Sequence, residues 1–227
     1  MVSNSWVSKW TSTQPLVRFD AAAISNVALP PESKEFLTSV GLPIRRLRFA
    51  PMTHLHANLP RLLDVTTDEV VPHGSSNLHV FSHHERIGRV TQYNCIAVPS
   101  GRVYGLSVHR YGSGPPTMTQ VFANSSILQF AQFILLLNEY GDWIHRHIES
   151  QPEIDEIDEN WFNVLEIVGV RARVKSLLAR LRRIDRFACG GVMECQTEAI
   201  DSAYAGLTAD TYWKPFIHAL ITRGLVD

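Results

Sequence analysis

The sequence predicts an α+β fold in which a central, largely antiparallel sheet is packed by helices. Three observations support this prediction in a chain of 227 residues. Short segments rich in β-branched and aromatic residues follow one another between residues 77 and 122. An almost wholly apolar helical segment comes next, and an amphipathic basic segment lies in the C-terminal third. Strands and helices thus occupy separate stretches of the chain, which is typical of α+β domains.

The predicted sheet is a meander over about residues 77–122. Polar or turn-forming residues separate five candidate strands: LHVF (78–81), ERIGRV (85–90), CIAV (95–98), VYGLSV (103–108) and TMTQVF (117–122). Such short connections join antiparallel neighbours, because parallel strands need a crossover of a dozen or more residues. We therefore expect consecutive strands to pair in antiparallel fashion.

A short helix is predicted before the sheet, in the segment PPESKEFLTSVGLP at 30–43. Pro31 suits the first turn of a helix, and Gly41 and Pro43 stop it. The prediction is a helix over 31–40 whose inward-facing residues are Phe36, Leu37 and Val40. Residues 44–75 contain three prolines and are expected to be irregular chain with brief strands.

A second helix is predicted after the sheet, in ANSSILQFAQFILLLNEYGDW at 123–143. With Ser126 as the N-cap, Gln129 occupies the third helical position and the two residues form a capping box. The helix behind them is apolar nearly all round, so we expect it to be the central core helix against the sheet. Gly141 is predicted to end it.

The formal net charge of −1 conceals two segments of opposite charge. Residues 149–159 carry six acids and no base, whereas residues 171–186 carry seven bases and one acid. Apolar residues recur at helical spacing in the basic segment, so its charges are expected on the wet face of an amphipathic helix: Val174, Leu177, Leu178, Leu181 and Ile184. The last predicted elements are a short strand at Val192–Cys195 and a closing helix through Trp213, Phe216, Ile217 and Leu220.

Domain count and compartment follow from composition. Without an internal repeat or linker, residues 1–227 are expected to form one domain with an N-terminal lead at 1–23. Three cysteines without a framework spacing indicate a reduced, intracellular protein. MVSNSWVSKW lacks the pattern of a secretory signal, and the most apolar run, Ile127 to Leu137, is too short for a membrane span. We expect a cytoplasmic protein.

No motif predicts an enzyme, a metal site or a cofactor. The cysteine spacing matches no redox or zinc motif, and Gly112-Ser113-Gly114 precedes two prolines that prevent a phosphate-binding helix. Two alternatives stay open. One is a metal-dependent hydrolase that uses the irregularly spaced His54, His56, His73, His79, His83 and His84. The other is nucleic-acid binding through Arg171–Arg186, against which the near-neutral charge argues.

Five segments, taken in order, resemble one known family. They are the PPESKEFLTSVGLP helix with its Gly-Leu-Pro exit, ERIGRV with Ile87-Gly88, CIAVPSGRVYGL with Gly101, FANSSILQFAQFILLLNEY with Asn124-Ser125-Ser126, and TYWKPFIHALITRG with Trp213. Over about residues 24–224 the chain resembles the SUKH superfamily, specifically its fourth group of bacterial polymorphic-toxin immunity proteins. The resemblance implies an α+β fold of the kind predicted above.

The resemblance also implies a non-enzymatic role. Bacterial members mostly bind and neutralise a cognate toxin, often a nuclease or a nucleic-acid deaminase. Fungal relatives are regulatory scaffolds, so a regulatory scaffold of the same fold without a toxin partner stays open as an alternative. The resemblance also implies that eight residues are markers of the family fold: Gly41, Pro43, Gly88, Gly101, Asn124, Ser125, Ser126 and Trp213. Residues 142–195 depart from the pattern and are expected to be an elaboration. If the toxin is a basic nuclease, the expected contacts are Glu153, Asp155, Glu156, Asp158 and Glu159.

Overall fold

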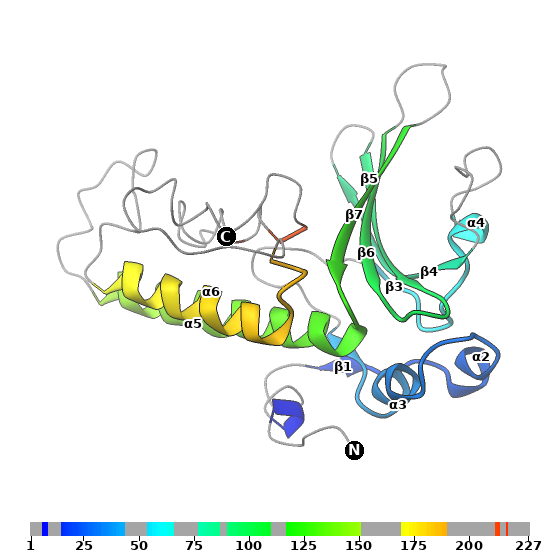
Figure 1. Cartoon of the computed structure of the whole chain (residues 1–227), viewed down its shortest axis with the longest axis horizontal. Helices are drawn as coiled ribbons and strands as arrows, with labels where there is room; N and C mark the ends of the chain where they lie inside the picture. The colour runs from blue at the N-terminus through cyan, green and yellow to red at the C-terminus, as the bar shows by residue number, and fades with distance from the viewer. Residues whose placement is uncertain are drawn as a thin grey trace. The chain divides into compact units, whose positions relative to one another are not determined.

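The structure, a computed structural model, describes residues 6–8, 15–43, 54–65, 77–86, 90–109, 117–150, 169–189, 212–213 and 217. The chain divides into two compact units. The sheet unit comprises residues 1–46 and 51–131, and the helical unit comprises residues 47–50 and 132–227. Figure 1 shows the elements of each unit, which are described separately below. That all 227 residues act as one domain stays a prediction.

The sheet unit is built on an antiparallel sheet with strand order β3-β4-β5-β6-β7. Its strands are β3 (His54–Leu55), β4 (Leu78–Arg86), β5 (Val90–Ala97), β6 (Val103–His109) and β7 (Thr117–Asn124). Each strand pairs with the next one along the chain. Short connections join β4 to β7 as predicted, whereas residues 56–77 separate β3 from β4. The predicted α+β class with an antiparallel meander is confirmed.

The predicted strand at 85–90 is wrong, because Glu85 and Arg86 end β4, Val90 begins β5, and residues 87–89 lie outside the described residues. The boundaries of the predicted strands on either side of it differ as well. β4 runs through His83 and His84, which were expected to be a connection, and β5 runs through residues 91–94, which were expected to be another. The reason is pairing: His83 lies opposite Tyr93 and His84 opposite Gln92, so these polar residues belong to one continuous ladder. Hydrogen bonds to the neighbouring strand satisfy the backbone groups of these residues. The polarity of a short segment does not reveal such pairing.

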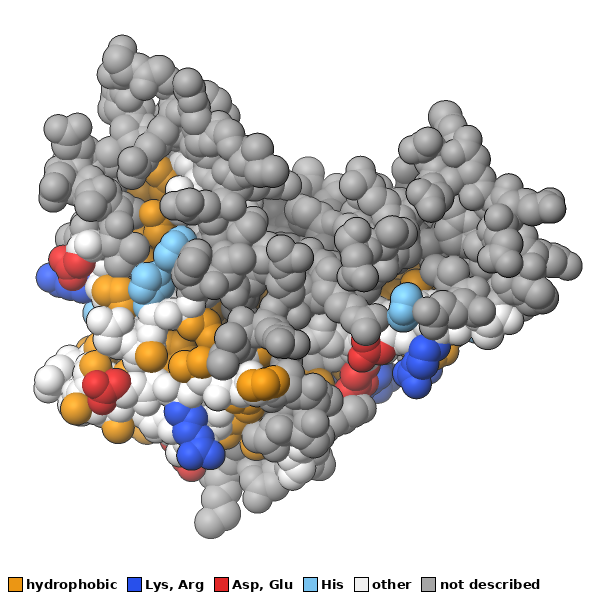
Figure 2. Space-filling view, turned by 180° about the vertical axis from the view of Figure 1, so that it is seen from behind, with side chains coloured by type: hydrophobic (Ala, Val, Ile, Leu, Met, Phe, Trp, Pro, Cys, Tyr) orange, Lys and Arg blue, Asp and Glu red, His pale blue; other side chains and the backbone are white. Residues whose placement is uncertain are grey.

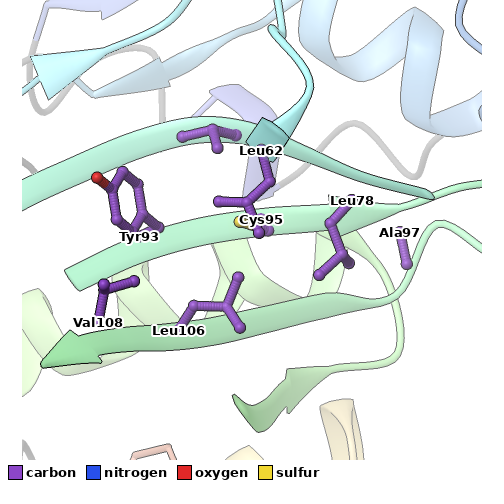
Figure 3. Packing of buried hydrophobic residues seen from close by; sticks show 8 residues of the cluster. Leu62, Leu78, Tyr93, Cys95, Ala97, Leu106 and Val108 are labelled. Carbon is purple, nitrogen blue, oxygen red and sulfur yellow. The ribbon is translucent and has the colours of Figure 1, made fainter. Parts of the chain in front are cut away.

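One face of the sheet carries a buried apolar cluster (Figure 3). Side chains that alternate along β5, together with residues of β4 and β6, meet Leu62 of α4 (Leu62–Val65). The cluster consists of Leu62, Leu78, Val80, Tyr93, Cys95, Ala97, Leu106 and Val108. Elsewhere in the unit, Phe81 of β4 meets Phe130 edge to face, with ring centroids 5.4 Å apart. The first turn of α5 (Ile127–Glu149) therefore packs against the sheet.

An N-terminal layer completes the sheet unit. It holds β1 (Leu16–Val17), α2 (Ala21–Ser25), α3 (Pro31–Ser39) and β2 (Leu42–Pro43), and β1 pairs with β2. α3 matches the predicted helix over 31–40 to within one residue, and Phe36 and Leu37 are buried as predicted. Val40 is half-buried and lies just beyond the last turn, where its N–H donates to the Phe36 carbonyl.

α5 does not end at Gly141, as predicted, but continues to Glu149. Gly141 is buried, and among the described glycines only Gly41, Gly101 and Gly169 have the positive φ that typically ends a helix. Tyr140 and Ile144 are also buried, so the apolar face continues past the glycine. This burial offsets the roughly 1 kcal/mol by which a glycine disfavours a helix interior.

The helical unit contains the rest of α5 and the basic helix α6 (Val170–Ile184). α6 confirms the amphipathic prediction, because Val174, Leu177, Leu178 and Leu181 are buried. Arg173 lies over the Trp143 ring and Arg180 pairs with Glu139, so α6 runs antiparallel to α5. Of the predicted closing helix, Ile217 N–H donates to the Trp213 carbonyl over 3.0 Å, which is one helical turn. The predicted strand at 192–195 lies outside the described residues.

Candidate partner-binding surface

The described fold markers of the sheet unit have structural roles. Gly41 has φ +90°, and a Cβ there would lie 2.1 Å from the Val17 carbonyl oxygen on the paired strand. Gly101 has φ +71°, and a Cβ there would lie 2.8 Å from Cγ of Pro30. Both positions require glycine for the backbone conformation and for close packing. Pro43 pairs with Leu16 in the two-stranded sheet, and Gly88 lies outside the described residues.

The Asn124-Ser125-Ser126 segment joins β7 to α5. Asn124 is fully buried at the end of the strand, opposite Val103 of β6. Ser126 Oγ accepts a hydrogen bond from Gln129 N–H over 3.2 Å and donates to Gln129 Oε1 over 3.1 Å. The predicted pairing of Ser126 with Gln129 is present, with the two side chains bonded to each other. The hydroxyl of Ser126 thus caps the first turn of α5.

Of the six histidines in the metal-site alternative, only His56, His79 and His83 have side chains that the structure describes, and these three are not arranged as ligands of one metal ion; histidines of the sheet unit lie at its surface (Figure 2). His73 and the side chains of His54 and His84 lie outside the described residues. His56 Nε2 and His83 Nδ1 are 2.8 Å apart, a hydrogen-bond distance, and the ring centroids are 5.0 Å apart. Two histidines that share a tetrahedral zinc hold their nitrogens roughly 3.3 Å apart, given Zn–N bonds of about 2.0 Å. His79 Nδ1 contacts the Leu59 carbonyl oxygen over 2.7 Å. The described residues contain no cluster of three or more metal-ligating side chains.

The two described cysteines are buried free thiols. Cys95 belongs to the apolar cluster of the sheet unit, and its burial raises the pKa of the thiol far above its usual value. Burial also raises the pKa of Cys189 to about 12; the Arg182 charge lowers it and the Asp185 charge raises it. Neither thiol is the depressed-pKa nucleophile that a cysteine enzyme requires. Cys195 lies outside the described residues.

The exposed polar surface of α6 is the most strongly charged part of the described chain. Arg171, Arg173, Lys175, Arg180 and Arg183 are exposed, and helix α6 contains no acid. Arg180 lies 3.7 Å from Glu139 of α5, and Arg173 lies 5.4 Å from the centre of the Trp143 ring. The acids expected to contact a toxin, residues 153–159, lie outside the described residues.

The chain after α6 contains a feature that the sequence analysis did not identify. Phe187 is 59% exposed, and the Arg186 guanidinium lies 4.9 Å from its ring centre. The sequence carries a signal for it, because on the helical spacing of Val174, Leu178 and Leu181 residue 187 falls on the charged side. An aromatic side chain on the charged side of this spacing does not fall on the buried face.

The family of the chain is shown by comparison with known proteins. The family model described as "SUKH-4 immunity protein" matches residues 2–215, which is nearly the whole chain. The chain belongs to this family. Neither the comparison with curated proteins nor that with solved structures returned a match. Membership implies immunity to a toxin, a cognate toxin partner and a role other than catalysis.

The family assignment agrees with the geometry of the described residues. The match runs through residues 142–195, and whether these residues are an elaboration on the family pattern stays a prediction. No described helix has the length and apolar character needed to cross a membrane. The glycines, Ser126 and the buried cysteines serve as turns, cap and core, and among the described residues the C-terminal end of α6 with Phe187 is the candidate for binding a partner.

Proposed function

We propose that this chain is a non-enzymatic, cytoplasmic immunity protein that binds a cognate polymorphic toxin as a single domain and occludes its active site. The toxin class we propose is a nuclease or a nucleic-acid deaminase. The observation that carries the proposal is the match to the immunity protein family over residues 2–215. The described titratable groups support it, since the histidine pair and the buried cysteines offer no assembled catalytic site.

We further propose that the acids Glu153, Asp155, Glu156, Asp158 and Glu159 contact a basic face of the toxin. Six acids and no base lie within residues 149–159, which is enough to attract a basic surface over several ångströms at physiological salt. Nucleases present such surfaces because they bind phosphates. The acidic segment would therefore steer the encounter and exclude the nucleic-acid substrate.

Co-expression tests the proposal. The toxin domain encoded beside this chain is produced in a bacterial host with and without it, and survival is counted. The chain should restore growth, and the purified pair should form a stable complex. A failure of both rescue and binding would contradict the proposal. A variant in which Asn and Gln replace the acids at 153–159 is tested in the same way. It separates the contribution of these acids to toxin binding from that of the rest of the fold.

A titration distinguishes binding from catalysis. The purified chain is added to the toxin, and the cleavage or deamination of a labelled RNA or DNA is measured. An occluding protein removes toxin activity linearly and completely at about one equivalent, because each molecule blocks one active site. If a small fraction of an equivalent inactivated all the toxin over time, the chain would be acting as an enzyme.

A further inference from the structure

The chain that follows α6 forms a fixed corner that holds an aromatic ring in solvent. Asp185 is buried, and its Oδ1 accepts hydrogen bonds from Phe187 N–H over 3.1 Å and Ala188 N–H over 3.2 Å. Its own N–H donates to the Leu181 carbonyl over 2.9 Å, which ties the corner to the last turn of the helix. Ala188 and Cys189 are buried directly beyond Phe187. These hydrogen bonds fix the backbone that carries Phe187 between the buried residues Asp185 and Ala188.

We call residues 182–187 the α6 corner. Phe187 is the one large hydrophobic side chain that is exposed among the described residues, and it stands beside a concentration of positive charge. Arg183 and Arg186 are exposed, and Arg186 covers part of the ring. No described carboxylate lies within ion-pair distance of these two arginines. Bases in the last turn complement the helix dipole, but that effect explains neither Arg186, which lies beyond the helix, nor the exposed ring.

Two arginines of the same helix have a different role. Arg173 and Arg180 lie toward α5, where they contact the Trp143 ring and Glu139. These contacts join the two helices, so packing within the protein explains the positions of both arginines. The arginines of the α6 corner make no such contact with α5 among the described residues. The positive charge at the corner is therefore available to a partner.

We propose that the α6 corner is a docking site for an acidic patch of the toxin that is separate from the basic face proposed to contact the acids at 153–159, with the Phe187 ring seated in an apolar pocket and with Arg183 and Arg186 paired to carboxylates around it. This inference rests on the proposed function. Aromatic and arginine side chains dominate the binding energy of protein interfaces when they are centred on a desolvated pocket. Because the Asp185 hydrogen bonds already fix the corner, little conformational freedom is lost on binding.

A protein partner fits the corner better than a nucleic acid does. Single strands are bound by several aromatic rings on which successive bases stack, along a basic groove. Here Phe187 is the one large hydrophobic side chain that is exposed among the described residues, so no second ring extends a stacking surface, and one face of its ring already holds the Arg186 guanidinium. The chain as a whole has a formal charge of −1, so it does not attract a polyanion from a distance.

The test uses the full-length chain and the toxin domain encoded beside it. Affinity is measured by calorimetry for Phe187→Ala, Arg183→Glu and Arg186→Glu. The matched control is Lys175→Glu, which makes the same change of charge on an exposed position of the same helix, two turns away from Arg183. Thermal melting by circular dichroism verifies that each variant is folded, as expected for exposed positions.

We expect Phe187→Ala to weaken binding about 30-fold or more and each corner arginine variant about 10-fold, with Lys175→Glu within about threefold of wild type. Folded corner variants that bind as tightly as wild type would overturn the docking site while leaving the proposed function intact. If wild type itself fails to bind the toxin, the proposed function falls and takes this inference with it. Salt-sensitive binding of a 20-nucleotide single strand that is lost in Arg183→Glu and Arg186→Glu would overturn the choice of a protein partner.

Discussion

The two units of this protein place their distinctive residues differently. In the sheet unit, Gly41 and Asn124 are buried where the backbone or the packing requires them. In the helical unit, the charges of α6 and the ring of Phe187 face solvent. A single exposed apolar side chain is common on protein surfaces, so the case for binding at Phe187 depends on the arginines beside it. The comparison supports a structural role for Gly41 and Asn124 and is consistent with the proposed recognition at the end of α6.

The largest expected effect is a difference in cysteine reactivity next to the α6 corner, where an exposed ring and a buried thiol lie two residues apart. Phe187 is 59% exposed, yet Cys189, two residues along, is 4% exposed, and burial raises its thiol pKa from 9.0 to about 12. At pH 8 its thiolate fraction should therefore be roughly a thousandfold below that of an ordinary cysteine. Iodoacetamide labelling followed by peptide mass spectrometry should find Cys189 and Cys95 modified only after unfolding. Rapid labelling of Cys189 in the native protein would show that the corner is open.

The same raised pKa fixes the direction of a pH effect. The folded state holds the Cys189 proton more tightly than the unfolded state, so its contribution to stability is complete below pH 9. That contribution declines as the pH rises toward about 12. Cys189→Ala should remove this part of the alkaline loss of stability, as measured by urea unfolding between pH 8 and pH 10. An unchanged pH profile in this variant would count against the buried position of the thiol.

Gly41→Ala should be the most destabilising glycine substitution in the described chain. It combines a φ of +90° with a Cβ 2.1 Å from the Val17 carbonyl oxygen, so β1 and β2 must separate. We expect a loss of about 3 kcal/mol or more in the free energy of unfolding, measured with urea. Gly169→Ala is the matched control: φ is +88°, but no atom lies within 4 Å of the added Cβ, so only about 1 kcal/mol is expected. Equal losses would refute the steric explanation.

Removing the N-cap of α5 should have an intermediate effect. Ser126→Ala deletes the acceptor of the Gln129 N–H bond and should destabilise the protein by about 1 kcal/mol. Ser126→Asp keeps an acceptor at the same position and should retain most of the stability. Toxin affinity should be unchanged in both variants, because the segment serves the fold. A large loss of affinity in a folded Ser126→Ala protein would move the binding site to the sheet unit.

The ion pair between α5 and α6 should contribute least. Arg180 and Glu139 are 3.7 Å apart, with side chains 49% and 24% exposed, so solvent screens their attraction. A double-mutant cycle with Arg180→Ala and Glu139→Gln should give a coupling energy of about 0.3 kcal/mol, reduced further at high salt. A coupling above roughly 1 kcal/mol would mean that the charge of α6 stabilises the fold, which would weaken the case for a binding role.

The sequence predicted the elements whose signals are local. The helix over 31–40 has its proline at the start and its glycine at the end, and the apolar spacing of α6 identifies the buried face. The errors, which are the missed pairing of β4 with β5 and the predicted end of α5 at Gly141, were non-local. His83 pairs with Tyr93, ten residues away, and Gly141 stays helical because its surroundings are buried. Neither the pairing partner nor the burial can be read from the residue itself.

The candidate site was predicted only in part. The charge of α6 was evident from the sequence, but the exposure of Phe187 depends on the side chain of Asp185, which caps the following turn. From sequence alone, Asp185 is one acid among seven bases, and its burial in the corner is not visible. The proposed acidic contacts at 153–159 lie outside the described residues and stay a prediction.

Hydrogen–deuterium exchange on the complex tests the central claim most directly, namely that the toxin docks at the end of α6 and not on the sheet. Exchange is compared for the free chain and for the chain saturated with the toxin domain that it neutralises. We predict that amides of residues 182–189 exchange more slowly in the complex and that those of β4 to β7 are unchanged. Slowed exchange confined to β4–β7, with residues 182–189 as fast as in the free chain, would contradict the account.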